Sequence, residues 1–323
     1  MTTTPTGVLV LAYGTPETLD DVEPYYTHIR GGRKPSAEAL ENLRERYRLV
    51  GGRTPLKDLT FAVSDRLQER LDEAAPGAYR VYTGMKHWHP FIAETVPQIV
   101  ADGVREVVAV VLAPHYSRYS LEGYRKYINQ ALEQVEEERR FRLHFIESWH
   151  AHPLFRRLIA GRITEQLDAF PAELRDQTRV VFSAHSLPEK ILAAGDPYPE
   201  QLHESAAGIA ELLALPSYGF CYQSAGMTGE PWLGPDILDY LDELHADGVR
   251  AVLSAPFGFV ADHLEVIWDI DTEAQQKADE LGMQLRRIRM PNADPEFVEV
   301  VRAVVMEADQ RRVEAAVTAE TVS

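Results

Sequence analysis

The chain has 323 residues, a formal net charge of −17, 45% hydrophobic and 26% charged residues. This length accommodates two domains of ordinary size, and the composition is that of a globular protein. The diffuse negative charge provides no field that attracts phosphate, so nucleic acid is not an expected partner.

Cysteine content and hydropathy narrow the class of protein further. Cys221 is the only cysteine, which excludes an intramolecular disulfide and any zinc or iron–sulfur site made of cysteines alone. The first residues lack a basic region followed by an apolar core, and apolar runs such as 107–113 are far shorter than the roughly 20 residues of a membrane helix. We therefore expect a cytoplasmic protein without an integral membrane segment.

Strand-like and helix-like stretches alternate along the first half of the chain. Apolar or β-branched runs predict strands at 7–12, 79–83, 106–113 and 142–146. Helical spacing or composition predicts helices at 56–71, 92–101, 120–140 and 153–170. Such alternation is typical of α/β folds with parallel sheets.

The second half repeats features of the first. The segment Ala101-Asp-Gly-Val-Arg105 recurs as Ala246-Asp-Gly-Val-Arg250, and each copy leads into a strand-like run that ends in Ala-Pro. The ends of two further strand-like runs, at Tyr13 and at His185, form a second matching pair. We expect two similar α/β domains that face each other, one at 1–174 and one at 175–323.

The two copies differ in length by about 30 residues, because Ala12 to Ala113 spans 101 residues and Ala184 to Ala255 spans 71. The segment 25–55 interrupts the regular alternation and is the candidate insertion, expected to lie over the cleft between the domains. A final helix is predicted from Asp294 and Pro295 to about residue 315, packing back on the first domain.

Metal-capable side chains follow two of the predicted strands in the second half. His185 ends the run 180–185, and Glu265 comes a few residues after the run that ends at Ala255. Ligands of parallel α/β sheets bind at the carboxyl ends of strands, where a His and a Glu can hold a metal ion or move protons. The alternative for His185 is a structural histidine bonded to neighbouring backbone.

Glu265 also opens an acidic series with Asp269 and Glu273. Spacing of four places these carboxylates on one helix face, where like charges repel by about 0.2–0.5 kcal/mol per pair. We interpret the outer two as a path for a cation, against the alternative of an exposed acidic face.

The candidate insertion has the opposite charge. Eight basic residues lie between residues 30 and 57, against three glutamates: Arg30, Arg33, Lys34, Arg44, Arg46, Arg48, Arg53 and Lys57. The planar guanidinium suits carboxylates or phosphates, and interleaved tyrosines suit a large flat ligand. A solvated helix surface is the alternative. His87 and His115 are further candidates for groups facing the cleft.

Several short segments, which follow one another in the same order and span nearly the whole chain, resemble segments of the ferrochelatases. The resemblance is strongest to the bacterial coproporphyrin ferrochelatases. The segments include 11–16, 25–30, 31–35, 183–190, 195–199, 201–205, 231–236 and 258–266. The resemblance implies a class II chelatase fold, with two Rossmann-like domains that insert Fe²⁺, the substrate metal, into a porphyrin held in the cleft between them. By contrast, a G-x-S-x-G elbow, a P-loop and a G-x-G-x-x-G site are absent from the sequence.

The resemblance also assigns roles by position. His185 and Glu265 correspond to the catalytic pair that binds iron and handles protons, and Tyr13 to the ligand of the product iron on the opposite face. Positions that contact the porphyrin are Arg30, Arg46, Tyr47, Thr54 and Tyr124. Asp269 and Glu273 correspond to the outer line of a possible metal path, to which His87, an inner-cleft histidine, is also assigned.

Tyr13 stands where members that use protoporphyrin tend to carry Met, which favours coproporphyrin III as substrate and its iron complex, coproheme, as product. A basic insertion agrees, because coproporphyrin has four propionates and protoporphyrin has two. The single cysteine predicts that no iron–sulfur cluster is held. We expect a monomer that hands its product transiently to a coproheme decarboxylase. Protoporphyrin IX or sirohydrochlorin as substrate, or a non-catalytic porphyrin carrier, are the alternatives.

Overall fold

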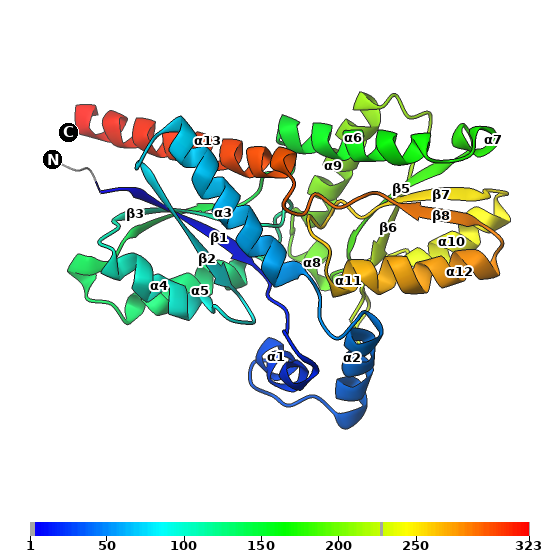
Figure 1. Ribbon diagram of the computed structural model, residues 1–323, viewed down its shortest axis with the longest axis horizontal. Helices are drawn as coiled ribbons and strands as arrows, with labels where there is room; N and C mark the ends of the chain where they lie inside the picture. Colours follow the sequence, from blue (N-terminus) through cyan, green and yellow to red (C-terminus); the bar gives the residue numbers. More distant parts are fainter. Residues whose placement is uncertain (1–3, 227–228, 323) are drawn as a thin grey trace.

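The computed structural model describes residues 4–226 and 229–322 and contains two four-stranded parallel sheets (Figure 1). The first has the order β2-β1-β3-β4 and the second the order β6-β5-β7-β8. The orders are identical when β1 is matched to β5, β2 to β6, β3 to β7 and β4 to β8. The expected α/β fold with two similar parallel sheets is therefore confirmed.

The elements alternate as the hydrophobic pattern predicts, with small differences at their ends. The first half contains β1 (Thr6–Ala12), α1 (Val22–Ile29), α2 (Ala37–Leu49), α3 (Leu56–Ala74), β2 (Tyr79–Met85), α4 (Ile92–Ala101), β3 (Glu106–Val111), α5 (Glu122–Glu133), β4 (Arg142–Ile146), α6 (Pro153–Asp168) and α7 (Ala172–Arg175), with short 3₁₀ turns at Leu19–Asp21 and Glu137–Arg139.

The second half contains β5 (Arg179–His185), α8 (Lys190–Ala193), α9 (Tyr198–Leu212), β6 (Gly219–Gln223), α10 (Ile237–Ala246), β7 (Ala251–Ala255), α11 (Leu264–Ile267), the π-helix η3 (Asp269–Ala274), α12 (Gln275–Glu280), β8 (Gln284–Arg287) and α13 (Pro295–Val322).

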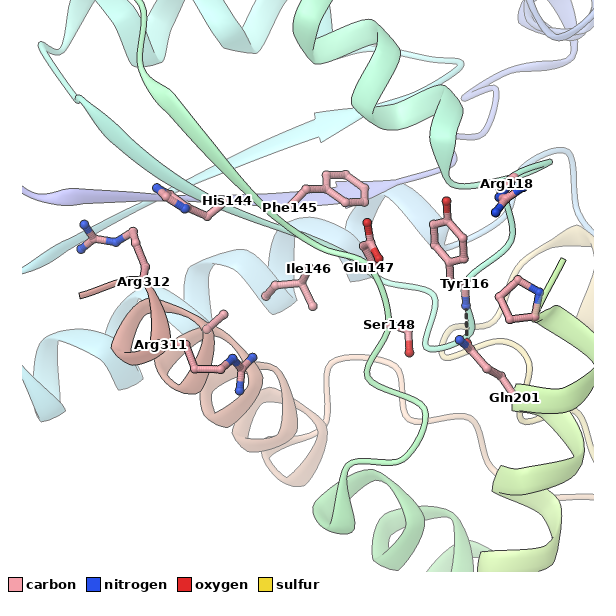
Figure 2. A pocket seen from close by; sticks show the side chains of 12 residues that line it. Tyr116, Arg118, His144, Phe145, Ile146, Glu147, Ser148, Gln201, Arg311 and Arg312 are labelled. Atoms are coloured by element: carbon pink, nitrogen blue, oxygen red, sulfur yellow. Dashed lines mark hydrogen bonds between the residues drawn. The ribbon is translucent and has the colours of Figure 1, made fainter. Parts of the chain in front are cut away.

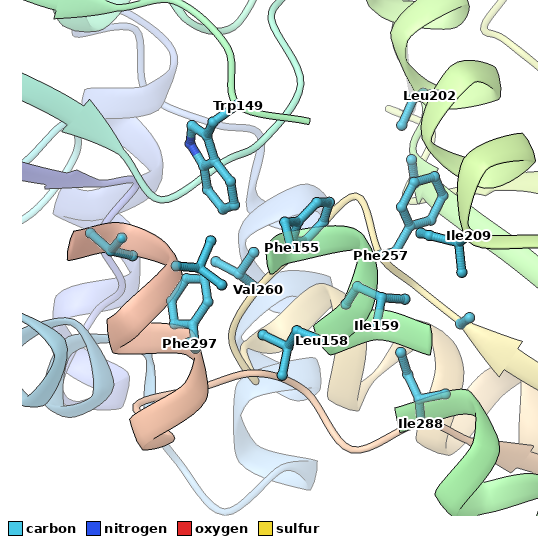
Figure 3. Packing of buried hydrophobic residues seen from close by; sticks show 14 of the residues in the cluster. Trp149, Phe155, Leu158, Ile159, Leu202, Ile209, Phe257, Val260, Ile288 and Phe297 are labelled. Atoms are coloured by element: carbon cyan, nitrogen blue, oxygen red, sulfur yellow. The ribbon is translucent and has the colours of Figure 1, made fainter. Parts of the chain in front are cut away.

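The central strands are buried on both faces. In β1, residues 8–11 (Val-Leu-Val-Leu) have no exposed surface, as expected for a parallel strand covered by helices on each side. One hydrophobic cluster runs through both halves of the molecule and includes Phe155 of α6, Phe257 and Phe297 (Figure 3). This shared core holds the two sheets together as one packed body.

Two helices each pack against the sheet of the other half of the chain. Helix α6 follows β4 in the chain, yet it packs against α9 and β7 of the second sheet. Helix α13 follows β8 and packs mainly against α3 and β3 of the first sheet (Figure 1). A division of the chain at 174/175 therefore separates α6 from the sheet that it covers.

The segment 25–55 contains most of α1, all of α2 and two glycine-containing turns, and it protrudes from the first sheet (Figure 1). Helix α2 begins at a serine cap, where the Ser36 hydroxyl accepts a hydrogen bond from the Ala39 amide at 3.2 Å. The Arg46 guanidinium at the end of this helix reaches the second half of the chain, 3.8 Å from the Asp269 carboxylate.

Candidate active site

Both parallel sheets direct their carboxyl ends toward the middle of the molecule (Figure 1). Tyr13 directly follows β1, and His185 is the last residue of β5. Because β1 and β5 occupy equivalent positions in their sheets, these two residues are equivalent in the repeat. The internal duplication thus places a tyrosine and a histidine at opposing strand ends.

The His185 ring is oriented by a hydrogen bond to the backbone. Its Nδ1 contacts the Ser186 carbonyl, which can only accept, so Nδ1 carries the hydrogen. This leaves Nε2 directed at Glu265, 3.5 Å from its Oε2 atom, with the two side chains 31% and 35% exposed. The His185 carbonyl accepts a hydrogen bond from the Tyr198 hydroxyl at 3.0 Å, which anchors the strand end.

Glu265 lies in the first turn of α11, at the end of a loop that packs closely on β5. At Gly258 in this loop, a Cβ atom would lie 2.8 Å from the Ala184 Cα, so only glycine permits the approach. The Gln223 side chain donates to the Glu265 carbonyl at 2.8 Å, and His263 Nε2 lies 3.7 Å from the Glu265 carboxylate. These contacts hold Glu265 beside His185.

The two groups form a coupled ion pair. Burial lowers the pKa of His185, but the Glu265 carboxylate and the Ser186 carbonyl outweigh it and raise this pKa to about 9. Burial raises the pKa of Glu265, yet the charge and hydrogen bonds of His185 and His263 hold it well below its usual range. At neutral pH the pair is therefore an imidazolium and a carboxylate.

The acidic series continues from Glu265 along a π-helix. The Glu273 amide donates to the Trp268 carbonyl at 2.9 Å, five residues back, instead of the four-residue bond of an α-helix. Asp269 is 6% exposed and is contacted by the Ser224 hydroxyl and by Arg46. Burial raises the pKa of Asp269 to about 7, with Glu265 and Glu273 adding to the shift. The three carboxylates thus interact along one row.

Tyr13 has surroundings of a different kind. Its ring centre lies 4.5 Å from that of His87, whose Nδ1 is 3.0 Å from Nδ1 of His28 on α1. Burial, Lys86 and His28 lower the pKa of His87 to about 3, so this ring is neutral. Tyr13 is 41% exposed, but the surrounding protein partly desolvates its hydroxyl and raises the pKa of the phenol, and Glu265 raises it further. Tyr13 is therefore a neutral phenol within electrostatic reach of Glu265.

Lys86 completes this neighbourhood. Its ammonium lies 5.9 Å from the centre of the Tyr13 ring and 5.0 Å from that of Tyr124, and it donates to the Ser120 carbonyl at 2.9 Å. Burial lowers the pKa of Lys86 to about 8. The structure thus brings Tyr13, His87 and Tyr124 together, whereas Asp269 and Glu273 lie on the side of His185 and Glu265.

Two of the expected porphyrin-contacting residues hold the insertion in place. Tyr47 and Thr54 are 2% and 4% exposed, and both bond the Thr15 hydroxyl, at 3.2 and 2.9 Å. Gly14, with φ of +95°, allows the chain to turn between Tyr13 and Thr15. Arg46 is half-buried with its guanidinium 5.6 Å from the Trp268 ring centre, so it links the insertion to the acidic row.

Ion pairs neutralise much of the insertion's positive charge. Five of its eight bases pair with carboxylates other than Asp269: Lys34 and Arg44 with Glu23, Arg48 with Glu41 and Glu45, Arg53 with Asp58, and Lys57 with Glu17. Arg30 is exposed and stacks 5.7 Å from the centre of the Tyr26 ring. Within the described part of the chain, Arg30 and Arg33 form no ion pair.

Comparison with known proteins identifies the family. The ferrochelatase family profile matches residues 5–309. The chain is 56% identical over 300 residues to the ferrochelatase of Herpetosiphon aurantiacus, an alignment that covers 93% of this chain and 98% of the relative. The chain belongs to the ferrochelatase family. Its activity is accordingly that of a lyase that inserts iron, as Fe²⁺, into a porphyrin.

Other relatives carry a more specific name. The coproporphyrin III ferrochelatases of Geobacillus sp. and Anoxybacillus flavithermus are 43% and 45% identical over 302 residues, with 93% of this chain and 96% and 95% of the relatives covered.

Among solved structures, the fold of this ferrochelatase resembles SirB from Bacillus subtilis, with a TM-score of 0.59 and 12% identity over 94% of this chain and 95% of that one. CbiX, with a TM-score of 0.53 and 12% identity, covers 94% of this chain and aligns over 99% of its own length. These confirm the chelatase fold.

His28 and Lys86 are neighbours of the site to which sequence reasoning assigned no role. Lys86 follows the end of β2, a position that could have marked it, because the carboxyl ends of parallel strands gather at one edge. Nothing in the spacing of His28, on α1, predicts its contact with His87. His115 is buried and bonds the Ser205 hydroxyl at 3.1 Å, between elements of the two halves.

No helix within residues 4–226 or 229–322 has the length and apolar character to cross a membrane. In the same ranges, no three His, Cys, Asp or Glu side chains lie close enough together to hold a metal ion.

Proposed function

We propose that this ferrochelatase inserts Fe²⁺ into coproporphyrin III, with His185 and Glu265 binding the metal on one face of the ring. The observation that carries this proposal is the 3.5 Å contact between His185 Nε2 and Glu265 at the strand end opposite Tyr13. Two side chains are too few to hold the ion alone, so the remaining ligands come from solvent and then from the porphyrin nitrogens.

The proton on His185 determines the order in which metal binding and proton transfer occur at His185 and Glu265. Insertion of Fe²⁺ releases two protons from the inner nitrogens of the ring. The imidazolium of His185 can neither bind Fe²⁺ nor accept a proton, because Nε2 carries one. Arrival of the cation beside Glu265 weakens the ion pair, and the His185 Nε2 proton passes to solvent along the acidic row. The neutral imidazole and the carboxylate bind the ion first, and they accept the two ring protons as the iron leaves them for the porphyrin nitrogens.

The acidic row provides a route for both kinds of cation. Asp269 has a pKa of about 7, so it binds and releases protons at working pH, and Glu273 continues the row outward from it. Inward movement of Fe²⁺ and outward movement of protons along the same row keep its net charge nearly constant. Buried like charges otherwise repel strongly, so this exchange lowers the barrier for both.

Tyr13 is suited to ligate the iron of the product from the other face. Its hydroxyl is neutral while the site holds no cation, and a bound iron ion favours the phenolate. His87, neutral and with its ring tilted by 54° against that of Tyr13, orients the phenol and lies on the porphyrin side, away from the metal path of Asp269 and Glu273. Tyr124 extends the aromatic wall, where Lys86 contacts both tyrosine rings.

The choice of coproporphyrin rests on charge as well as on the names of the relatives. Arg30 and Arg33 offer guanidinium groups that no described carboxylate neutralises, while Arg46 is held near Asp269. A substrate with four propionates gains more from these groups than one with two. Tyr47 and Thr54 act by fixing the insertion that presents the arginines.

The test is anaerobic insertion of Fe²⁺ followed by absorbance, with coproporphyrin III and protoporphyrin IX as parallel substrates. We expect a higher kcat/KM for coproporphyrin III. Replacement of Arg30 by Gln is expected to raise KM for coproporphyrin III more than for protoporphyrin IX. A preference for protoporphyrin IX would overturn the substrate assignment, and insertion into neither would favour a carrier.

A further inference from the structure

A groove of about 890 Å³ lies away from the candidate active site, along the outer side of β4 (Figure 2). Its walls come from β4 and the following residues 147–148, from α13 with Arg311 and Arg312, and from Arg118 in the loop after β3. Gln201, near the start of α9, closes one end, so the groove touches both halves of the molecule. Nothing in the proposed reaction uses it.

Strand β4 is an open edge of the first sheet. The Arg142 amide donates to the Arg105 carbonyl at 2.8 Å, so Arg142, His144 and Ile146 turn their backbone groups toward β3. By alternation, Leu143 and Phe145 turn theirs away from the sheet. Among the described residues, no hydrogen bond partner is found for the Leu143 and Phe145 amides. An edge of this kind is a template for another strand.

Two other edges are closed by the protein itself. At β2, the Gln68 side chain accepts from the Val81 amide at 2.7 Å and donates to the Tyr79 carbonyl at 3.2 Å. At β6, the Tyr222 amide donates to the Pro235 carbonyl at 2.8 Å. The open backbone of β4 is therefore not a general feature of the edges in this fold.

The charges on β4 do not obstruct its edge. Exposed charges commonly protect edge strands from pairing. Here Arg142 and His144 are both tied to Glu106 of the neighbouring strand, at 2.6 and 2.7 Å. The edge therefore remains accessible from the groove.

The groove has more positive than negative side chains in its lining, on a chain of net charge −17: Arg118, Arg311 and Arg312 against Glu147. Arg118 forms no ion pair within the described ranges, and Arg311 lies 3.9 Å from Glu307 with both groups more than half exposed. At β8, which is equivalent to β4, Arg287 is already held by Asp271 and Asp262, at 2.7 and 3.1 Å. Arg118 and Arg311 beside β4 are thus available to a ligand, whereas Arg287 of β8 is held by two carboxylates.

We propose that β4 is a docking site for an extended acidic segment of a partner protein, which adds to the first sheet as a further strand. Backbone hydrogen bonds to Leu143 and Phe145 give affinity, and carboxylates that meet Arg118 and Arg311 give specificity. A second copy of this chain fits less well, because symmetric pairing of two β4 edges brings these arginines against their own kind. Because the chain has a net charge of −17, an acidic segment is repelled by most of the remaining surface.

The experiment uses the full-length protein and a blocked, fluorescent peptide of alternating Glu and Val as the probe. The same peptide with Lys in place of Glu is the comparison. Binding is followed by anisotropy, and hydrogen exchange at the Leu143 and Phe145 amides is measured with and without peptide. We expect binding of the acidic peptide alone, with exchange at both amides slowed at least about tenfold.

The double variant Arg118→Glu, Arg311→Glu is expected to weaken acidic peptide binding at least about tenfold while iron insertion is unchanged. Arg175→Glu is the matched control, since α7 lies at the opposite end of the molecule from the groove-lining part of α13 (Figure 1). Equal binding of the two peptides, unprotected amides, or an unchanged double variant would each overturn the proposal. Protection of these amides that depends on protein concentration alone would show a second copy as the occupant instead.

Discussion

The ends of β1 and β5 occupy equivalent positions, yet their side chains create opposite electrostatic conditions. At β1, Tyr13 and His87 are neutral at working pH, and His87 has a pKa of about 3. At β5, His185 has a pKa of about 9 because Glu265 faces it. Burial lowers the pKa of both histidines, so the difference arises from the partner: a carboxylate beside His185, and Lys86 and His28 beside His87.

A duplicated fold can thus place chemically different groups on opposite sides of one substrate. The topology supplies two strand ends that face each other, and the loops that follow them supply the charge. In the proposed reaction, the polar, ionised end binds the cation and moves protons, while the neutral, aromatic end supports the flat ring. We expect variants that exchange the charged and neutral groups at the ends of β1 and β5 to lose activity but to keep the fold.

The largest expected effect comes from removing the ionised pair. His185→Ala should lower the rate of iron insertion by at least about 100-fold, because the variant loses both a metal ligand and a proton acceptor. Porphyrin binding, followed by fluorescence quenching, should remain close to that of the wild type. Replacement of His203, an exposed histidine on α9, by Ala serves as the control. Near-normal turnover by the His185 variant would refute the assignment.

A second variant should make the β5 end resemble the β1 end. In Glu265→Gln, burial is no longer offset by a carboxylate, so the pKa of His185 should fall from about 9 to below the ordinary 6.5. Titration of the His185 ring by NMR checks this shift. The pKa of His87 should stay low in the same spectra, because its causes lie in the first half. A His185 pKa that stays near 9 would contradict the pairing described here.

Asp269 allows a test through stability. Its folded pKa of about 7 exceeds the ordinary value of 3.8, so the folded state binds this proton more tightly than the unfolded state. Below about pH 4, Asp269 is protonated in both states and does not affect the free energy of unfolding. Between about pH 4 and pH 7, the raised pKa of Asp269 lowers the free energy of unfolding progressively. Asp269→Asn removes this effect and should raise the free energy of unfolding at pH 8 by about 1–3 kcal/mol.

Urea unfolding of both proteins at pH 8 and at pH 4 measures this difference. The gain should disappear at pH 4, where the wild-type carboxyl is protonated. Asp271→Asn is the control, because that exposed carboxylate is paired with Arg287 and its loss should not stabilise the protein. An equal gain at both pH values would assign the effect to something other than ionisation of Asp269.

The smallest expected effect is at the neutral strand end. Tyr13→Phe keeps the ring beside His87 but removes the hydroxyl, so the rate of insertion should change by less than about tenfold. After oxidation of the bound product to Fe³⁺ with ferricyanide, its iron–phenolate absorption should be absent in this variant. A loss of insertion as large as that of His185→Ala would mean that both strand ends take part in the chemical step.

Much of this architecture could be predicted because it depends on local patterns. The apolar run at residues 8–11 is a buried strand wherever its helices lie, and the repeated segments at 101–105 and 246–250 lead into equivalent strands. His185 and Glu265 could be singled out for the same reason, since residues just after parallel strands gather at one edge. Whether a residue lies just after a strand can therefore be predicted from the sequence around it.

Other features arise from contacts between distant segments. The packing of α6 against the second sheet has no local signal, because an apolar helix face fits either sheet. The regular spacing of Glu265, Asp269 and Glu273 predicts an α-helix, whereas the structure has a π-helix from Asp269 to Ala274. The eight bases of the insertion indicated a free positive surface, but five of them are paired with carboxylates that folding brings near.

The sequence by itself determined the two parallel sheets, the duplication, and the residue types at the two strand ends, because these follow from the order of apolar and polar residues. Only the tertiary structure decided which groups are charged. A pKa depends on burial and on partners far away in the chain, such as Glu265 for His185 and His28 for His87. The chemical difference between two equivalent strand ends is therefore a property of the folded molecule.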